Sequence, residues 1–438
     1  MEKRHRNDWR LTLALFALTG LVESLAWGHL GAFTPLYLAE LRVPPDSVGY
    51  WVGILSSLGF VIGLPLLPFW GVWADRYGRK LVIVRSSIAG AIMFALASRA
   101  PDVWTLAASR FLGGLVLGNT GVMMAVQTEI TPRRRLGLAL AIAGAGSPIG
   151  MAAGPLIGGW MVAERGVRPL LMMDALLTMG VALLLIALLR EEPRGDRPRL
   201  GTRAGLVAAF RAIAGLPAVR GVFGATFLMA YGLSVAQPYL PVLVERLHTG
   251  APQTLPIVIG NVLTAAGLAM AATTPLWGWA GDRLGYVAAW RICAVVVGLA
   301  HVGQAAAGSV ESVAAWRVLQ GLCQGGVTSL AMALLAVETP ATSRSTVMAL
   351  SLLPMQLAWF TGPLSGAALQ VAGARAPFWA GAAALALGVG ATRWLTGRRG
   401  ERPPAAAAPT RQESEGLEGN GRKESELASH RGGVQKSE

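Results

Sequence analysis

Four charged side chains stand well inside long apolar runs of the sequence: Glu23, Arg110, Asp174 and Arg317. They are exceptions in a chain of 438 residues with 38 basic and 24 acidic side chains. A charge at the centre of a hydrocarbon layer costs about 2.5–3.5 kcal/mol on insertion scales, so each should face protein or water. Buried ionisable groups of this kind are the first candidates for binding protons or a substrate.

Glu23 lies 13 residues after Arg10, which is about 20 Å along a helix. Its helical face is polar and aromatic, at steps of 7, 4, 4 and 7 through Thr12, Thr19, Glu23, Trp27 and Thr34. A buried carboxyl group can take up and release a proton, which suits exchange of a proton for a cationic substrate. The alternative is a structural carboxylate that a neighbouring helix satisfies.

Arg110 lies eight residues past Asp102, about 12 Å into its run and at a depth similar to that of Glu23. The two side chains are therefore candidates for a pair or a shared proton relay. Gly114 and Gly118 continue the same face and leave room for a close neighbour or a cavity. The alternative is a structural arginine that binds backbone carbonyls.

A second polar face follows Arg317, with Gln320 and Gln324 at helical spacing, and a further apolar run offers Tyr231. Such a face on an apolar helix should line water or a substrate, so we predict a cavity formed by these residues and Trp27. Hydrogen bonding between helices of the two halves is an equally good interpretation of the glutamines. Asp174 is expected near the outer surface. His29 and His301 are expected to be lone histidines with structural hydrogen bonds, because neither has a partner at metal-ligand spacing.

The elements that position these side chains follow from composition. The chain is 53% hydrophobic and only 14% charged, whereas soluble domains carry about 25% charge. About 20 apolar residues cross a bilayer, and such segments must be helical to satisfy their backbone. We predict an all-α membrane protein with twelve spans at 11–36, 49–70, 80–98, 102–127, 136–162, 169–190, 219–244, 255–279, 287–308, 312–336, 345–371 and 376–396.

An internal repeat divides these spans. The stretches "PFWGVWADRYG" and "PLWGWAGDRLG", at 68–78 and 275–285, share six of eleven residues, and the same offset of 207 carries Arg110 onto Arg317. Two pseudo-symmetric six-helix bundles explain this register. The predicted domains are an N-terminal bundle at 1–190, a cytoplasmic linker at 191–218, a C-terminal bundle at 219–397 and a disordered cytoplasmic tail at 398–438.

The net charge of +14 does not indicate nucleic-acid binding, because the basic residues occur in short clusters between apolar runs. Their distribution places both termini on the cytoplasmic side of the membrane, and the resemblance described below implies that this is the bacterial cytoplasmic membrane. Two cysteines give no disulfide framework. No nucleotide-binding loop, metal cluster or catalytic constellation stands out, so we expect no cofactor and no enzymatic activity. We expect a monomer.

Three motifs carry a resemblance to a known family. "GVWADRYGRK" resembles the signature turn of the major facilitator superfamily, "RFLGG" its fourth-helix motif, and "GMAAGPLIGG" the fifth-helix motif of its antiporters. The resemblance is greatest to the twelve-helix bacterial drug/proton antiporters. It implies that Arg110 takes part in proton coupling. It also implies that helices one, four, seven and ten line a central cavity. The fifth-helix residues are Gly150, Gly154, Pro155, Gly158 and Gly159, which give a flat face for close packing and a kink.

The resemblance further implies a cytoplasmic gate in which Asp75 pairs with Arg344. Its members in the first turn are Gly71, Asp75, Arg76, Gly78 and Arg79. Arg79 is also expected to hold the turn at the anionic lipid surface, and a topology anchor without a switching role is the alternative. Asp282 and Arg283 occupy the repeated turn. That turn departs from the pattern, because Tyr286 and Val287 replace the basic pair.

These observations favour a secondary transporter that exports small amphiphilic compounds in exchange for protons, by alternating access. The partners expected are a small-molecule substrate, protons and the lipid bilayer. A proton-coupled transporter of one metabolite, such as a sugar, an organic acid or a siderophore, is the alternative within transport. A membrane receptor or scaffold without transport activity is the alternative of another class.

Overall fold

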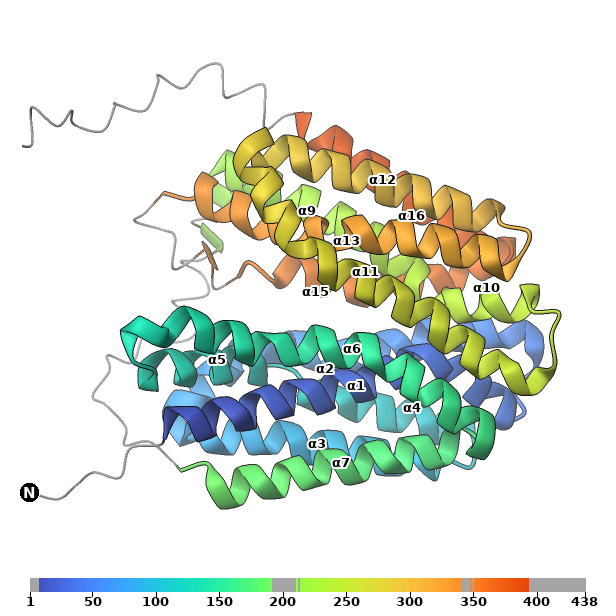
Figure 1. Cartoon of the computed structure of the whole chain (residues 1–438), viewed down its shortest axis with the longest axis horizontal. Coiled ribbons are helices and arrows are strands. Elements are labelled where there is room, and N and C mark those ends of the chain that lie inside the picture. The colour runs from blue at the N-terminus through green and yellow to red at the C-terminus, as the bar shows by residue number, and fades with distance from the viewer. Residues whose placement is uncertain (1–7, 191–209, 212, 341–346, 349, 394–438) are drawn as a thin grey trace, which may run out of the picture. The chain divides into compact units, whose positions relative to one another are not determined.

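The computed structural model describes residues 8–190, 210–211, 213–340, 347–348 and 350–393, apart from the side chains of 68, 71, 72 and 75. These residues form helices joined by short turns and contain no strand. Figure 1 shows the helices running roughly alongside one another. The predicted disordered tail and nearly all of the predicted linker lie outside the described residues.

Each predicted span corresponds to one helix or to a broken pair. The N-terminal half consists of α1 (Trp9–Glu40), α2 (Pro45–Tyr77), α3 (Arg79–Ser98), α4 (Val103–Leu112), α5 (Asn119–Ile130), α6 (Leu136–Arg165) and α7 (Val167–Leu188). The C-terminal half consists of α9 (Pro217–Ala236), α10 (Leu240–Leu247), α11 (Leu255–Leu284), α12 (Tyr286–Ala306), α13 (Val310–Glu338), α15 (Leu353–Leu369) and α16 (Ala376–Ala391). Within the described residues, ten segments are long and apolar enough to cross a membrane, with α4–α5 and α9–α10 each counted as one. The domain boundaries themselves remain a prediction.

The fourth span is not the continuous helix that the sequence suggested. It changes to a 3-10 turn at Gly113–Val116, and Gly118 takes a φ of +95°, a left-handed conformation that favours glycine. Neighbouring side chains of α3 satisfy the carbonyls that this break frees. Ser86 donates to the Val116 carbonyl at 2.7 Å, and Arg85 donates to the Leu117 carbonyl at 3.2 Å. A chain interruption at membrane depth is tolerated where protein groups supply such partners.

The seventh span is also broken. A 3-10 turn at Gln237–Tyr239 separates α9 from α10, where Pro238 and Pro241 lack the N–H groups that a continuous helix needs. Further along, the repeated turns share a backbone geometry. Gly78 has φ and ψ of 113° and 143°, and Gly285 has 86° and 138°, each between two helices. This positive φ explains why both copies of the turn keep a glycine at that position.

The glycines of α6 face two helices. A Cβ atom added at Gly150 would lie 2.3 Å from the Leu21 carbonyl oxygen, and Gly154 approaches the backbone of α1 similarly. On another face of α6, Gly159 lies against Pro256 at the start of α11, and Thr264 donates to the Ala152 carbonyl at 2.8 Å. The antiporter-like stretch therefore packs α6 against α1 within its own half and against α11 of the other half.

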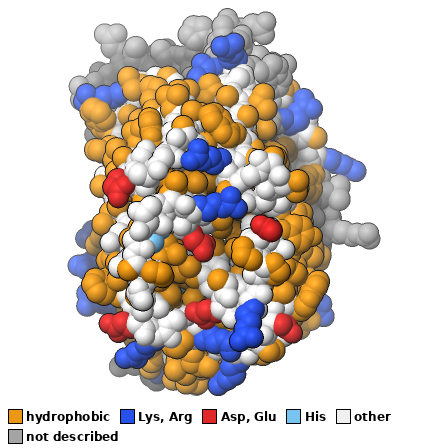
Figure 2. All heavy atoms as spheres, turned by 90° about the vertical axis from the view of Figure 1, so that its right-hand side faces the viewer, with side chains coloured by type: hydrophobic (Ala, Val, Ile, Leu, Met, Phe, Trp, Pro, Cys, Tyr) orange, Lys and Arg blue, Asp and Glu red, His pale blue; other side chains and the backbone are white. Residues whose placement is uncertain are grey.

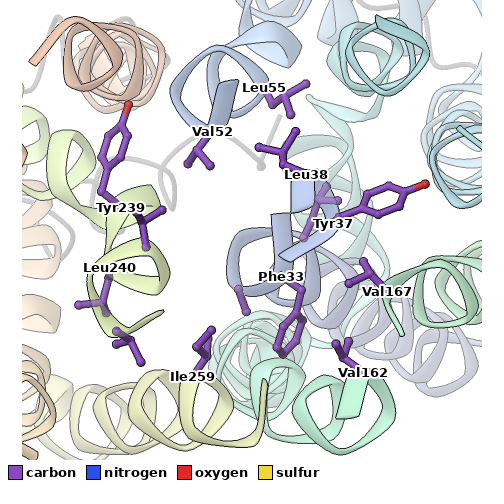
Figure 3. Packing of buried hydrophobic residues seen from close by; sticks show 14 of the residues in the cluster. Phe33, Tyr37, Leu38, Val52, Leu55, Val162, Val167, Tyr239, Leu240 and Ile259 are labelled. Carbon is purple, nitrogen blue, oxygen red and sulfur yellow. The ribbon is translucent and has the colours of Figure 1, made fainter. Parts of the chain in front are cut away.

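One end of the helices carries an apolar core shared by both halves, and we call it the closed end. It includes the end of α1 and the start of α2. Its buried residues include Phe33, Tyr37, Leu38, Val52, Leu55, Val162, Val167, Tyr239, Leu240 and Ile259 (Figure 3). Ser57 of α2 also donates to the Phe360 carbonyl of α15 at 2.8 Å. A separate apolar cluster around Trp70 and Val82, near the other end of α2, draws only on the N-terminal half.

The outer face of the closed end is mixed in chemistry. Figure 2 shows acidic and basic side chains distributed among apolar ones on this face. Exposed charged residues there include Glu40, Arg42, Asp46, Glu245 and Arg246. A charged rim over an apolar core is typical of the point where spanning helices leave the bilayer.

The packing of α6 on α1 predicts how two glycine substitutions differ. Gly150→Ala should lower the thermal unfolding midpoint, because its Cβ must displace the α1 backbone, an overpacking change of about 1–3 kcal/mol. Gly144→Ala on the same helix meets only the end of the Met124 side chain at 3.9 Å, so it should be neutral or stabilising by up to about 1 kcal/mol. Thermal unfolding of the two purified variants in detergent checks this, and equal midpoints would contradict it.

Candidate functional site

Glu23 is held at the helix break. The Asn119 amide, on the first residue of α5, donates to both carboxylate oxygens at 3.0 and 2.8 Å. Ser87 of α3 makes a longer contact of 3.4 Å to one of the same oxygens. The half-buried carboxyl thus joins α1, α3 and α5, and the interruption of the fourth span is what brings Asn119 to it.

Arg85 belongs to this site, although sequence analysis did not select it. Its guanidinium lies 3.2 Å from the centroid of the Trp70 ring, and its charge acts on Glu23. Its Nε and Nη1 atoms are buried without a hydrogen-bond partner in the described chain. The predicted third span began only five residues earlier, so Arg85 was placed near the membrane edge. The available signal was a basic residue within "LVIVRSSIAG", followed by two serines.

Arg110 does not bind Glu23. Its Nε donates to the Leu55 carbonyl at 3.2 Å, and its guanidinium carbon lies 5.6 Å from the centroid of the Trp27 ring. The residue is only 6% exposed, and its Nη1 atom has no hydrogen-bond partner. The structure therefore gives Arg110 and Glu23 separate partners, with Trp27, one turn after Glu23 on α1, beside the arginine.

Asp174 and His29 differ most from the sequence interpretation. His29 Nδ1 and Asp174 Oδ1 are 2.8 Å apart, and both side chains are completely buried. Asp174 is buried inside the protein, and His29 makes the structural hydrogen bond that was expected of it, but with an acidic partner rather than as a lone histidine. The two residues are 145 positions apart, and only the packing of α7 on α1 brings them together.

The polar residues of the C-terminal half form a chain of hydrogen bonds. Gln304 of α12 donates to Gln320 of α13 at 2.8 Å, and Gln320 donates to Gln324 at 3.1 Å. Gln320 thus bonds between two helices of the C-terminal half, and not between the two halves as the alternative interpretation had it. Arg317, one turn before it, is 7% exposed. Tyr231 of α9 shares a hydrogen bond with Ser365 of α15 at 2.5 Å.

A small cavity lies among α9, α12, α13 and α15. Its volume is about 40 Å³, and its lining is mainly apolar and aromatic: Thr226, Ala230, Leu233, Trp290, Gln324, Val327, Thr328, Met355 and Trp359. Of the predicted cavity residues only Gln324 reaches it, whereas Trp27, Tyr231, Arg317 and Gln320 lie elsewhere. A mainly apolar lining with a few polar groups is typical of small-molecule sites.

The first copy of the repeated turn makes its described contacts within the N-terminal half. Arg79 forms a two-pronged ion pair with Glu129 at the end of α5, with N–O distances of 2.6 and 3.0 Å. The Arg76 guanidinium lies 5.2 Å from the Tyr77 ring centroid. The predicted pairing of Asp75 with Arg344 lies outside the part of the chain that the structure describes.

The repeated turn has its own contacts. Tyr286 donates to the Asp282 carboxylate at 2.5 Å, and the Arg283 guanidinium lies 4.3 Å from the Trp279 ring centroid. Tyr286 is the residue at which this copy departs from the first, where a basic residue stands. Asp282 is thus held within one turn of its own segment.

The contact between Glu23 and Asn119 predicts a measurable coupling. Glu23→Leu and Asn119→Leu should each lower the thermal stability, and the double variant should lose less than the sum by about 1.5–3 kcal/mol, the range for hydrogen bonds to a charged group. Glu23→Leu combined with Ser24→Ala is the control, since Ser24 bonds to Ser147 and not to Glu23. Unfolding of the purified single and double variants checks this, and additive losses for the Glu23–Asn119 pair would contradict it.

Known proteins are similar to this chain along most of its length. Multidrug resistance protein MdtG from a Rahnella species is 26% identical over 402 residues, covering 90% of this chain and 95% of that protein. MdtG from Salmonella arizonae is 27% identical over 378 residues, covering 85% and 92%. These relatives match nearly the full length of the described helices.

Solved structures show the same fold. A bacterial homologue of the human lysosomal transporter Spinster, in an inward-facing and unoccupied conformation, superposes with a TM-score of 0.75 at 15% identity, covering 92% of this chain and 100% of that chain. The human organic anion transporter MFSD10 (TETRAN) superposes with a TM-score of 0.64 at 19% identity, covering 88% and 100%. The predicted all-helical membrane fold is confirmed.

A model of a protein family also matches this chain. The model described as Major Facilitator Superfamily matches residues 16–257 and 222–431, which together include the described helices of both halves apart from residues 9–15 at the start of α1. The chain is therefore a multi-pass membrane transporter, and it belongs to the Major Facilitator Superfamily.

Proposed function

We propose that this transporter exports small amphiphilic compounds, cationic or neutral, in exchange for protons. The observation that carries the proposal is Glu23, a half-buried carboxyl group at a helix break and hydrogen-bonded at both oxygens by Asn119. Intramembrane carboxyl groups in such settings are typical of proton relays. The relatives named multidrug resistance proteins support a drug-like substrate.

Glu23 is proposed as the group that binds the proton. In its ionised form both oxygens accept hydrogen bonds from the Asn119 amide, and protonation of either oxygen removes one of them. Asn119 starts α5 directly after Gly118, so loss of that bond acts on the most easily altered part of the fourth span. This links proton binding to helix rearrangement. Arg110, through Trp27, is proposed to stabilise the same region.

The cavity near Gln324 is proposed as part of the substrate site. Trp290 and Trp359 offer aromatic faces, which attract organic cations as well as apolar rings. Gln324 and Thr328 offer neutral polar contacts to one end of an amphiphile. Tyr231, Arg317 and Gln320 are proposed to complete the path when the halves move, since they occupy the same helices.

The closed end supports alternating access. With both termini in the cytoplasm of a bacterial cell, as the basic residues predict, the closed end faces outward and the molecule is open to the cytoplasm. The likeness to an inward-facing transporter supports this assignment. The turn at Gly71–Arg79, with Asp75 and Arg344, is proposed to close the opposite end in the other state, with Asp282 and Arg283 in the repeated turn. We propose that one chain is the functional unit.

Transport of an organic anion is a second candidate. Arg110 and Arg317 are buried arginines that form no ion pair in the described chain, and an anionic substrate would supply the missing charge. The likeness to the organic anion transporter MFSD10 shows fold alone, at 19% identity. We therefore rank it below export of cations and neutral compounds.

Transport by purified protein in liposomes tests the proposal. A proton gradient should drive uphill movement of the fluorescent cation ethidium. Glu23→Gln should lower this gradient-driven movement at least tenfold, while downhill exchange of ethidium persists. The control is Glu164→Gln, an exposed carboxyl at the end of α6. Ethidium flux that ignores the gradient, or a Glu23→Gln variant that transports uphill normally, would refute proton coupling through Glu23. Gradient-driven movement of carboxyfluorescein instead would favour the anion candidate.

Accessibility of the closed end tests alternating access. In a chain with both native cysteines replaced, a cysteine at Val52, which is 1% exposed, should resist an impermeant maleimide. Substrate and a proton gradient should raise its labelling severalfold from the outer side of intact cells. A cysteine at Tyr50, which is 52% exposed, serves as the control and should label equally in both conditions. Unchanged labelling at Val52 during active transport would contradict the proposed motion.

A further inference from the structure

The His29–Asp174 pair is not used by the proposed mechanism, yet it has the chemistry of a proton site. The Nδ1–Oδ1 contact of 2.8 Å fixes one side of the imidazole ring. The opposite ring atom, Nε2, is buried without a hydrogen-bond partner in the described chain, and so is Asp174 Oδ2. Buried polar atoms are normally satisfied, so two open positions on one pair call for an explanation.

The ring is held firmly in place. A Cβ atom added at Gly158 of α6 would lie 2.7 Å from His29 Cδ2, so the helix backbone packs directly on the imidazole. The glycine in the antiporter-like stretch is therefore what admits a histidine at this position. A ring clamped between α6 and the Asp174 carboxylate cannot turn away when its charge changes.

A small cavity joins His29 to Arg110. It measures about 10 Å³, and its lining includes His29, Thr34, Tyr37, Leu55 and Arg110. This volume is near the lower limit of about 10–15 Å³ for one water molecule. Arg110 Nη1 is also without a partner. The other lining residues are mainly apolar, so the histidine and the arginine, each with an open polar atom, are the basic groups in the wall of one small cavity.

The charges around the pair can be accounted for helix by helix. α7 contributes Asp174, α4 contributes Arg110, and α1 contributes Tyr37, whose hydroxyl donates to the Ala97 carbonyl. α2 and α6 contribute the apolar Leu55 and Gly158. With a neutral imidazole, one acidic residue, Asp174, and one basic residue, Arg110, give this cluster no net charge, although the two form no ion pair in the described chain. A second proton would leave one uncompensated positive charge in a buried space, which favours a change of state.

We propose that His29 and Asp174 form a second proton-binding site, coupled through the shared cavity to Arg110. The proton passes from a hydronium ion in the cavity to the lone pair of His29 Nε2 and leaves water behind; release reverses this step. Asp174 Oδ1 accepts the Nδ1–H bond and balances the imidazolium. His29 follows Glu23 on α1 by six residues, about 9 Å along the axis, so one helix carries both sites. The inference rests on the proposed proton coupling.

Histidine protonation can be measured without transport. The chain has five histidines, and solid-state NMR of the full-length protein in liposomes, labelled with [15N]histidine, resolves their ring nitrogens. The signal missing in His29→Asn belongs to His29, and it should change from the neutral to the protonated form as the pH is lowered. Its midpoint should move by at least one pH unit in Asp174→Asn and in Arg110→Gln. His301→Asn is the matched control, because His301 is equally buried, packs on Gly381 and bonds only the Val297 carbonyl. It should leave the His29 titration unchanged.

A His29 signal that does not titrate, or that ignores both Asp174 and Arg110, would overturn the proposal. If Asp174→Asn fails to fold, Arg110→Gln by itself provides the comparison, because it also removes a charge beside the same cavity. In ethidium-transporting liposomes, His29→Gln should lower the number of protons moved per ethidium by one, while Glu164→Gln should not. An unchanged proton count in His29→Gln would also overturn the proposal. If wild-type protein shows no gradient-driven flux, the proposed function fails, and the NMR titration still decides the second site.

Discussion

A backbone group inside a bilayer has no water to bond, so any interruption of a helix must be repaired by protein. The interruption between α4 and α5 meets this constraint through α3, whose Ser86 and Arg85 take the carbonyls of Val116 and Leu117. The repair places Asn119 at the start of a new helix, from which its amide reaches Glu23. The candidate proton site is therefore a consequence of how the break is satisfied. An unbroken helix would turn the same residues elsewhere.

Close backbone approach is the second condition. The glycines of α6 let it touch α1 on one face and α11 on another, so the same helix serves both the interior of its half and the contact between halves. In lipid there is little hydrophobic gain from bringing helices together, and small residues that allow tight contact take its place. At the closed end an apolar core spans both halves, and α2 and α15 share a single side-chain bond from Ser57. A small number of such contacts between the halves can break and re-form at a modest cost in free energy.

The buried charges of the N-terminal half lie in two separate regions. Glu23, Asn119 and Arg85 surround the helix break, whereas His29, Asp174 and Arg110 surround a small cavity toward the closed end. Trp27 stands between them on α1, beside the Arg110 guanidinium. Charge in one region alters the electrostatic energy of the other, because screening inside the protein is weak. The C-terminal half contains the buried Arg317 and otherwise offers neutral glutamines and aromatic rings.

The sequence by itself determined the fold class and the family, because apolar runs must be helices in lipid and the repeated turns require glycines at fixed positions. It also identified Glu23, Arg110 and Gln324. It did not identify Arg85, which lies near a span boundary, or the His29–Asp174 pair, whose members are 145 residues apart. Only the tertiary structure decided that the fourth span breaks at Gly113–Gly118, that Arg110 binds Leu55 and not Glu23, and which polar residues reach a cavity. Helical periodicity defines the face on which a residue lies, but the partner on that face depends on how distant helices pack.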